Sequence, residues 1–408
     1  MRFALLTILL LAAGTVFGAW QSVGPDGGYI QALAVDPVQP ERLYAVPYEY
    51  PANARVFRSL DRAASWSVAG TIPYQSVTAF AVDPHNTSLL YALARGTALY
   101  RSTDCGQNWA EAALPGYASA LAPDRAVAGR VYLAGYYSYG GDYRAAAYVS
   151  TDYGLNWSVS MPAPDTVSYA YAVAADPQVA GTVYLGAYST QLYKSTDAGA
   201  SWVRSSSGIP ANSTTQALSV NPENSRVVLA AQTDGVYRTS DGGANWVRVG
   251  DMTGAMSVAF GAGGATAYAL GRSDSIRVWV SDDSGATWFL PRPGYTTLKS
   301  AQLQPDPVES QTAWLSSQTG IYRSTDTGAN WGPAHAGLRI TKITCISASP
   351  ADPNRLYVEV VDNGVFKTLT AGDSWTRCND FLSCGSICGI GIAVNSGRDV
   401  LYAFEGSG

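Results

Sequence analysis

An eight-residue phrase that recurs along the chain constrains the fold more than any other feature of the sequence. It has the form Ser/Thr-x-Asp-x-Gly-x-x-Trp, as in STDTGANW from residue 324. Copies begin at residues 59, 102, 150, 195, 239, 281, 324 and 368, so successive copies are 42 to 48 residues apart. So regular a period is typical of a repeated structural unit.

The sequence between the copies repeats as well. Segments 32–46, 79–93 and 172–186 each contain an alternating apolar run, a turn with proline and a second apolar run. A third run leads into the phrase, and a short fourth run follows its Trp. Each unit of about 44 residues therefore predicts four short antiparallel strands, the pattern of a β-propeller blade.

The phrase resembles the Asp-box, or BNR, repeat of sialidases, two-propeller xyloglucanases, sortilin-type VPS10 domains and photosystem II assembly factors. The resemblance covers essentially all of the mature chain and implies an all-β fold. We expect a β-propeller of about eight complete four-stranded blades plus a partial ninth unit, GIGIAVNSGRDVLYAFEGSG. Either the terminal strands combine into a closing blade, or the chain is a fragment of a longer protein. The absence of a third strand from the ninth unit favours the fragment.

We expect the Asp-boxes to be structural. Ser or Thr and Asp can hydrogen-bond nearby backbone groups as in ST and Asx turns, Gly supplies a positive φ, and Trp packs between blades. An active site needs unlike groups at one point, whereas these carboxylates would lie in equivalent places around a ring. Two boxes depart from the pattern, with Ala63 replacing Gly and Thr370 replacing Asp. The predicted structural residues are Asp61, Trp66, Asp104, Trp109, Asp152, Trp157, Asp197, Trp202, Asp241, Trp246, Asp283, Trp288, Asp326, Trp331 and Trp375.

A four-stranded meander places the boxes and the proline turns on one rim and the loops between strands two and three on the other. We therefore expect binding on the rim opposite the boxes, where the loops at 46–55 and 135–146 are long and rich in tyrosine. The alternative is that these tyrosines pack over a wide blade edge. The candidate ligand-binding residues are Tyr48, Tyr50, Tyr136, Tyr137, Tyr139 and Tyr143.

The function that we expect first is non-enzymatic binding of a protein or glycan ligand. The alternative is a glycoside hydrolase of xyloglucanase or sialidase type, which needs two carboxylates about 5 to 10 Å apart. Glu49 and Asp142, one in each long loop, are the candidates for that pair.

The resemblance carries over no catalytic residue. The segment WQSVGPDGGYIQALAVDP resembles the start of the xyloglucanases, in which an Asp soon after a Tyr-Ala step is catalytic; residues 46–48 of this chain are Val-Pro-Tyr at that place. Sialidases have an Arg-Ile-Pro type step before the first box, and no such step precedes Ser59.

Charge and histidine content exclude several functions. The net charge is -5 without a run of Lys and Arg, so we expect no nucleic-acid partner. The two histidines, His85 and His335, lack metal-ligand or triad spacing, and we expect neither a metal nor a cofactor.

Five cysteines are present, three of them within CNDFLSCGSIC. A disulfide within that cluster is favoured over a metal site, because three sulfurs cannot supply four ligands. The connectivity stays open among Cys345, Cys378, Cys384 and Cys388, and Cys105 is the fifth cysteine.

The N-terminus has the features of a secretory signal peptide. Arg2 precedes an apolar run from Phe3 to Ala13 and the small-residue stretch GTVFGA, which predicts a signal peptide over residues 1–18 with cleavage after Gly18 or Ala19. No other stretch is long and apolar enough to span a bilayer. We expect residues 19–408 to form one propeller domain that is secreted, periplasmic or at the cell surface, as a monomer.

Overall fold

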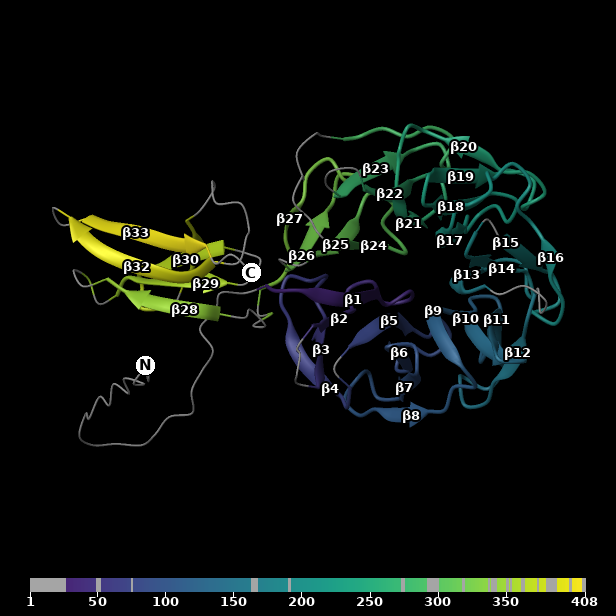
Figure 1. Cartoon of the computed structure of the whole chain (residues 1–408), viewed down its shortest axis with the longest axis horizontal. Helices are drawn as coiled ribbons and strands as arrows, with labels where there is room; N and C mark the ends of the chain where they lie inside the picture. The colour runs from purple at the N-terminus through teal and green to yellow at the C-terminus, as the bar shows by residue number, and fades with distance from the viewer. Residues whose placement is uncertain are drawn as a thin grey trace.

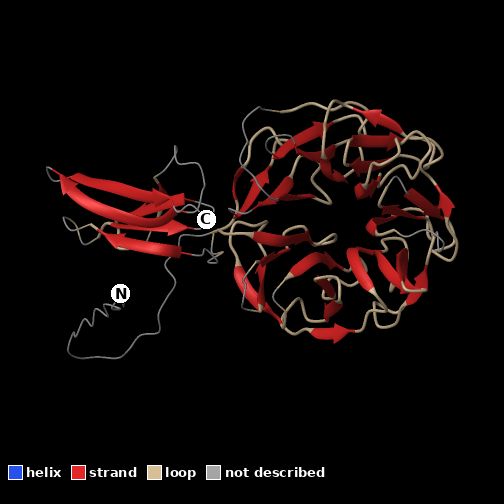
Figure 2. Ribbon diagram, viewed as in Figure 1, coloured by secondary structure: helices blue, strands red, loops and turns tan. Residues whose placement is uncertain are grey.

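The structure is a computed structural model, in which the described residues form 33 strands and no helix (Figure 2). The first described residue is Gly27, so the predicted signal peptide over residues 1–18 lies outside the described residues. Those residues are 27–48, 53–74, 76–162, 168–189, 192–272, 276–291, 301–317, 320–336, 338, 343–349, 352, 354–360, 364–372, 374–378, 387–395 and 398–405.

Seven sheets follow one another around a ring and are called blades one to seven (Figure 1). Blade one contains β1 (Ile30–Val35), β2 (Leu43–Pro47), β3 (Ala54–Ser59) and β4 (Ser67–Ile72). Blade two contains β5 (Val77–Val82), β6 (Leu90–Ala94), β7 (Ala98–Ser102) and β8 (Ala110–Ala112). Blade three contains β9 (Tyr117–Pro123), β10 (Val131–Tyr139), β11 (Asp142–Ser150) and β12 (Ser158–Ser160). Blade four contains β13 (Ala170–Ala175), β14 (Val183–Ala187), β15 (Leu192–Ser195) and β16 (Val203–Arg204).

The remaining blades keep the same order. Blade five contains β17 (Thr215–Val220), β18 (Val228–Gln232), β19 (Gly235–Thr239) and β20 (Val247–Val249). Blade six contains β21 (Ala255–Phe260), β22 (Ala267–Arg272) and β23 (Ile276–Ser281). In place of the fourth strand of the other blades, Phe289 forms a single β-bridge with Val280. Blade seven contains β24 (Ala301–Pro305), β25 (Ala313–Ser317), β26 (Gly320–Ser324) and β27 (Gly332–Pro333).

Each blade is an antiparallel meander whose strands have different exposure. The second strand is buried along its length in blades one, two, four, five and seven, because neighbouring blades cover both of its faces. The short fourth strand faces outward, and Val203 and Val247 there are mostly exposed. The core consists of the apolar layers between adjacent blades.

Blade one packs directly against blade seven and closes the ring. Leu43 and Phe57 share a buried cluster with Trp314 and Leu338. The Trp66 N–H donates to the Ala336 carbonyl at 3.0 Å across this junction. The ring is therefore closed with seven blades, and no space remains between blades one and seven for an eighth blade.

The seven blades of the ring correct the expectation of about eight complete blades. The eighth repeat forms a separate sheet of β28 (Ile343–Ala348), β29 (Leu356–Val360), β30 (Gly364–Thr368) and β31 (Thr376–Arg377). The ninth unit forms a hairpin of β32 (Ile387–Asn395) and β33 (Arg398–Glu405), and β28 packs on β32 outside the ring (Figure 1).

The boxes and the turns between first and second strands lie on one rim, the box rim. In blade one the Arg62 N–H, within the box, donates to the Glu41 carbonyl of that turn at 2.9 Å, and every other box makes the equivalent bond. The loops between second and third strands form the other rim, the loop rim. There the Ala118 N–H at the start of blade three donates to the Gly96 carbonyl of blade two at 2.8 Å.

Candidate functional site

Each box is a closed hydrogen-bonded turn, as the third box shows. Ser150 Oγ donates to Asp152 Oδ1 at 2.8 Å and accepts the Gly154 N–H at 2.8 Å. Asn156 then donates its backbone N–H to Asp152 Oδ1 at 2.9 Å and its side-chain amide to Oδ2 at 2.7 Å. Both carboxylate oxygens are thus occupied within the turn. Equivalent bonds form around Asp61, Asp104, Asp197, Asp241, Asp283 and Asp326.

These hydrogen bonds lower the pKa of the box carboxylates. Donation by the Asn156 side chain and backbone, with a further bond from Ser150, holds the pKa of Asp152 at about 2. The backbone and side chain of Asn108 do the same for Asp104, whose pKa is also about 2. A general acid in a glycosidase needs a raised pKa, so these carboxylates are suited to hold a turn rather than to donate a proton.

The two divergent boxes keep the same turn. Ala63 has φ of 65° and its N–H donates to Ser59 Oγ at 2.9 Å, so the alanine adopts the left-handed conformation expected of glycine. Thr370 Oγ1 accepts the Ser374 N–H at 3.0 Å, in place of an Asp oxygen.

The box tryptophans have two kinds of contact. Trp66, Trp246 and Trp331 are buried, whereas Trp109, Trp157, Trp202, Trp288 and Trp375 are half-buried. Trp246 Nε1 donates to the Ser205 carbonyl of the preceding blade at 2.8 Å, but Trp109 Nε1 donates to Gly106 of its own box at 3.0 Å. The indole partner does not follow burial, because buried Trp331 donates to the Gly328 carbonyl of its own box at 3.1 Å and half-buried Trp202 donates to Ser160 Oγ of the preceding blade at 3.0 Å.

Four tyrosine rings gather on the loop rim between blades three and four, and we call them the tyrosine cluster. Tyr117 and Tyr136 are stacked with ring centroids 4.6 Å apart. Tyr169 meets Tyr136 edge-on at 5.1 Å, and Tyr143 meets the same ring at 4.9 Å. Tyr143 is 48% exposed, so the cluster presents an aromatic surface to solvent.

A long hairpin and an inter-blade connection position the cluster. β10 and β11 have nine residues each and are joined by Gly140 and Gly141, both with positive φ, as a tight hairpin turn requires. Tyr169 precedes β13, and the Tyr188 N–H donates to its carbonyl at 2.9 Å.

Four tyrosines in or near this site were not predicted from the sequence, because they lie outside the long tyrosine-rich loops. The inter-blade connections share the same rim, and tyrosines at their ends were the signal that could have found them. Tyr171 is 39% exposed and Tyr188 is 52% exposed. The missed residues are Tyr117, Tyr169, Tyr171 and Tyr188.

The other predicted tyrosines do not join the cluster. Tyr48 is 45% exposed and lies 5.8 Å from the Tyr29 ring in blade one. Tyr137 is half-buried and packs against the buried cluster that contains Tyr148. Tyr50 and the Tyr139 side chain lie outside the described residues.

The predicted carboxylate pair cannot be placed, because Glu49 lies outside the described residues. Asp142 is exposed on the hairpin and accepts from Arg144 at 3.1 Å. Another loop-rim carboxylate, Asp234, accepts from Ser213 and from the Tyr237 hydroxyl at 2.6 Å. Burial alone would raise the pKa of Asp234, but these donors outweigh it and the pKa is lowered. Asp234 is therefore not a general acid of the raised-pKa kind.

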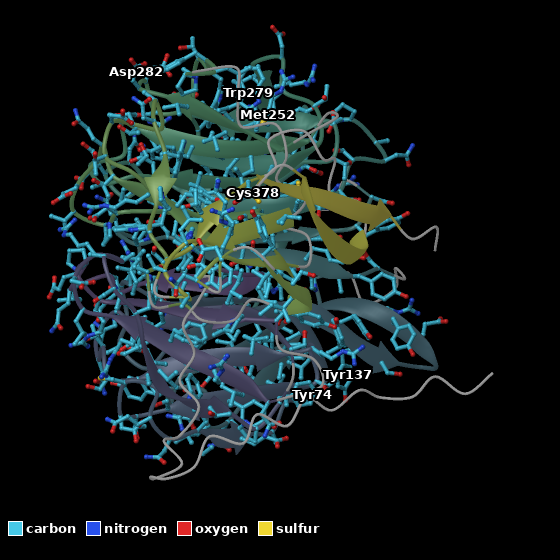
Figure 3. The ribbon with its side chains drawn as sticks, turned by 90° about the vertical axis from the view of Figure 1, so that its left-hand side faces the viewer. Tyr74, Tyr137, Met252, Trp279, Asp282 and Cys378 are labelled. Carbon is cyan, nitrogen blue, oxygen red and sulfur yellow. The ribbon has the colours of Figure 1, made fainter. Side chains whose placement is uncertain are left out.

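Metal ligands, thiols and membrane spans add no site to the described part of the chain. No three His, Cys, Asp or Glu side chains gather there as around a metal ion. Cys105 and Cys378 are free thiols (Figure 3 labels Cys378), and the side chains of Cys345, Cys384 and Cys388 lie outside what is described. Within the described residues no helix is long and apolar enough to cross a membrane.

Comparison with known sequences finds propeller relatives. A family model described as Sortilin-Vps10 (sortilin, neurotensin receptor 3) matches residues 145–276. A xyloglucanase of Paenibacillus sp is 34% identical over 111 residues, which are 24% of this chain and 11% of the relative. A xyloglucanase of Hypocrea jecorina is 37% identical over 91 residues, which are 19% of this chain and 11% of the relative. The chain thus spans 11% of the length of these relatives.

Solved structures show the same fold. An ancestral GH74 enzyme has a TM-score of 0.74 at 19% identity, covering 96% of this chain and 60% of its own. The GH74 xyloglucanase of Xanthomonas campestris has a TM-score of 0.65 at 17% identity, covering 90% and 70%. YCF48 of Cyanidioschyzon merolae has a TM-score of 0.53 at 16% identity, covering 75% and 98%.

The chain is therefore a β-propeller protein that resembles VPS10 and xyloglucanase propellers, as its repeats predicted. The sequence relatives are glycoside hydrolases, so the comparisons favour the hydrolase alternative over the non-enzymatic function that we expected first.

Proposed function

We propose that this chain binds a β-glucan of the xyloglucan class on the loop rim, with the tyrosine cluster as the contact surface. The observation that carries the proposal is the set of contacting rings of Tyr117, Tyr136, Tyr143 and Tyr169. Tyrosine offers a flat apolar face and a hydroxyl at its tip, which suits a sugar chain with apolar ring faces and polar edges.

The similarity to xyloglucanases supports this choice of ligand. This similarity covers a small part of those enzymes, so the xyloglucan class of ligand is part of our proposal. Secretion through the N-terminal segment would bring the protein to extracellular polysaccharide, and we include export in the proposal.

Titration calorimetry with xyloglucan oligosaccharides tests the binding. Replacing Tyr143 of the cluster, or Tyr188, whose backbone bonds to Tyr169, should weaken binding roughly tenfold because one exposed ring is lost. Tyr153→Ala is the matched control, since Tyr153 is 36% exposed and lies in a box. Equal affinities for wild type and Tyr143→Ala would exclude the cluster as the contact surface, and wild-type affinity of Tyr188→Ala would exclude Tyr188 from that surface.

Glycoside hydrolysis is the second candidate, and the xyloglucanase relatives favour it. Asp142 is the described carboxylate closest in sequence to the cluster residue Tyr143. Release of reducing sugar from xyloglucan that disappears in Asp142→Asn or Glu49→Gln would establish hydrolysis. Retention of full activity in both variants would exclude that carboxylate pair.

A further inference from the structure

The seven blades surround a central channel. At one turn position that lines this channel, blade three has an arginine, whereas five of the other six blades have proline. At the box rim each first strand ends in a turn whose second residue lines the channel. Blade three has Arg125 there and blade six has Ala262. The other five blades have Pro37, Pro84, Pro177, Pro222 and Pro307.

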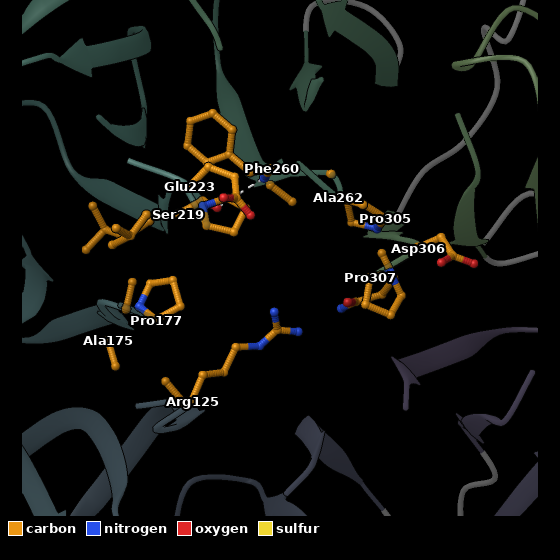
Figure 4. Close-up of a pocket in the computed structure, with 18 of the residues that line it drawn as sticks. Arg125, Ala175, Pro177, Ser219, Glu223, Phe260, Ala262, Pro305, Asp306 and Pro307 are labelled. Atoms are coloured by element: carbon orange, nitrogen blue, oxygen red, sulfur yellow. Dashed lines mark hydrogen bonds between the residues drawn. The ribbon is translucent and has the colours of Figure 1, made fainter. Parts of the chain in front are cut away.

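Arg125 projects into a cavity of about 680 Å³ (Figure 4). Pro177, Pro222, Pro307 and Phe260 line its walls. Arg125 also borders an adjoining cavity of about 250 Å³ toward blades one and two, so it lies where the two halves of the channel meet.

The Arg125 guanidinium forms no ion pair or hydrogen bond with the described residues, and Arg125 is exposed to the channel. The blades around it lower the pKa of Arg125 by desolvation, even though the side chain stays accessible from the channel. Arginine nevertheless remains protonated in proteins. An oxyanion in the cavity would pair with this cation and accept a bidentate hydrogen bond from it.

The carboxylates on the wall do not neutralise Arg125. Asp306 is fully buried and accepts from Arg62 at 2.7 Å as well as from two backbone N–H groups. Glu223 is exposed at the rim and makes no ion pair with the described residues.

Blade six supplies a second feature of an anion site. In blade one, Asp36 Oδ1 accepts the N–H groups of Val38 and Gln39, which lie two and three residues further along the turn. Blade six has Gly261 at the Asp position, so its turn lacks that carboxylate. The Gly263 N–H donates to no described residue, and Gly263 is exposed where it lines the same cavity as Arg125.

We propose that the box-rim half of the channel binds an oxyanion, carboxylate or phosphate, at Arg125, in the cavity that the carboxylate-free turn of blade six also lines. Backbone N–H groups that are not used within a turn and a guanidinium are both established anion ligands. The site opens on the rim opposite the tyrosine cluster and is independent of the proposed glucan binding.

The test is titration of the full chain with inorganic phosphate and with acetate, at ionic strength held constant with chloride. We expect saturable binding that weakens at least about tenfold in Arg125→Pro, which restores the residue of five other blades, and in Arg125→Gln. Arg226→Gln is the matched control, because Arg226 is exposed on the same rim outside the cavity lining.

The outcomes separate the ligand classes. Binding of phosphate alone supports a phosphate site, and binding of acetate alone supports a carboxylate site. The absence of saturable binding by either anion would overturn the proposal, and so would undiminished binding in both Arg125 variants. A neutral xyloglucan oligosaccharide should leave anion affinity unchanged.

Discussion

At the scale of single residues, the box is a backbone device that uses two successive left-handed positions. The residue before the Gly position also has positive φ, as Cys105 at 59° and Tyr153 at 61° show. This was not predicted from the sequence, because Arg, Cys, Tyr, Ala, Gly, Ser and Thr all occur there and leave no compositional signal. The Asn, Ser or Thr before each Trp can be recognised in the sequence, and its side chain donates a hydrogen bond to the box Asp.

The left-handed strain at Ala63 predicts a stabilising substitution. Ala63→Gly should raise the free energy of unfolding by up to about 1 kcal/mol, because relief of strain exceeds the extra chain entropy of glycine. Gly106→Ala is the reverse change, at φ of 88° in the second box, and should cost about 1–2 kcal/mol. Denaturant unfolding measures both, and shifts of equal sign would contradict the assignment.

The lowered pKa values predict loss of stability in acid. The carboxylates of Asp104, Asp152 and Asp197 have pKa values of about 2 in the folded chain, below the unfolded value near 3.9. Their contribution is therefore complete above pH 4 and is lost as pH falls toward 2. Asp152→Asn should melt lower than wild type at pH 6 and converge with it near pH 2. A difference that persists at pH 2 would contradict this origin.

At the scale of strands and blades, the repeat predicted the four-stranded units and the separation of the two rims. The long β10–β11 hairpin could be predicted from the sequence, because the loop at 135–146 is longer than its counterparts in most other units. The contact of Tyr117 and Tyr169 with that hairpin was not, because the packing angle between neighbouring blades decides it. Local patterns therefore predicted one half of the cluster, and the arrangement of blades supplies the other half.

The contacts between blades predict unequal roles for the box tryptophans. Trp246 is 2% exposed and bonds to Ser205 of the preceding blade, so Trp246→Ala should cost about 3–5 kcal/mol. Trp109→Ala should cost less, because its half-buried ring bonds within its own box. Chemical denaturation compares the two, and equal losses would contradict the difference in packing.

At the scale of the whole molecule, ring closure depends on contacts between the first and last blades. The number of blades could not be predicted, because the repeat period is unchanged where the chain leaves the ring at the eighth unit. Arg62 spans the closure, with ion pairs to Asp306 at 2.7 Å and to Glu309 at 2.9 Å.

Removing this closing ion pair should loosen the ring. Arg62→Gln leaves the Asp306 carboxylate buried without its cation, and we expect a loss of about 2–3 kcal/mol with faster hydrogen exchange in β1 and β25. Arg355→Gln breaks a half-exposed pair outside the ring and should cost less than about 1 kcal/mol. Unchanged exchange in Arg62→Gln would show that the ion pair does not contribute to ring closure.

Hydrogen exchange of the full chain with and without xyloglucan oligosaccharide tests the central claim most directly. Glucan binding to the tyrosine cluster predicts protection at residues 136–143, 169–171 and 188, with the boxes unaffected. Protection confined to the box rim, or no protection at saturating oligosaccharide, would contradict it.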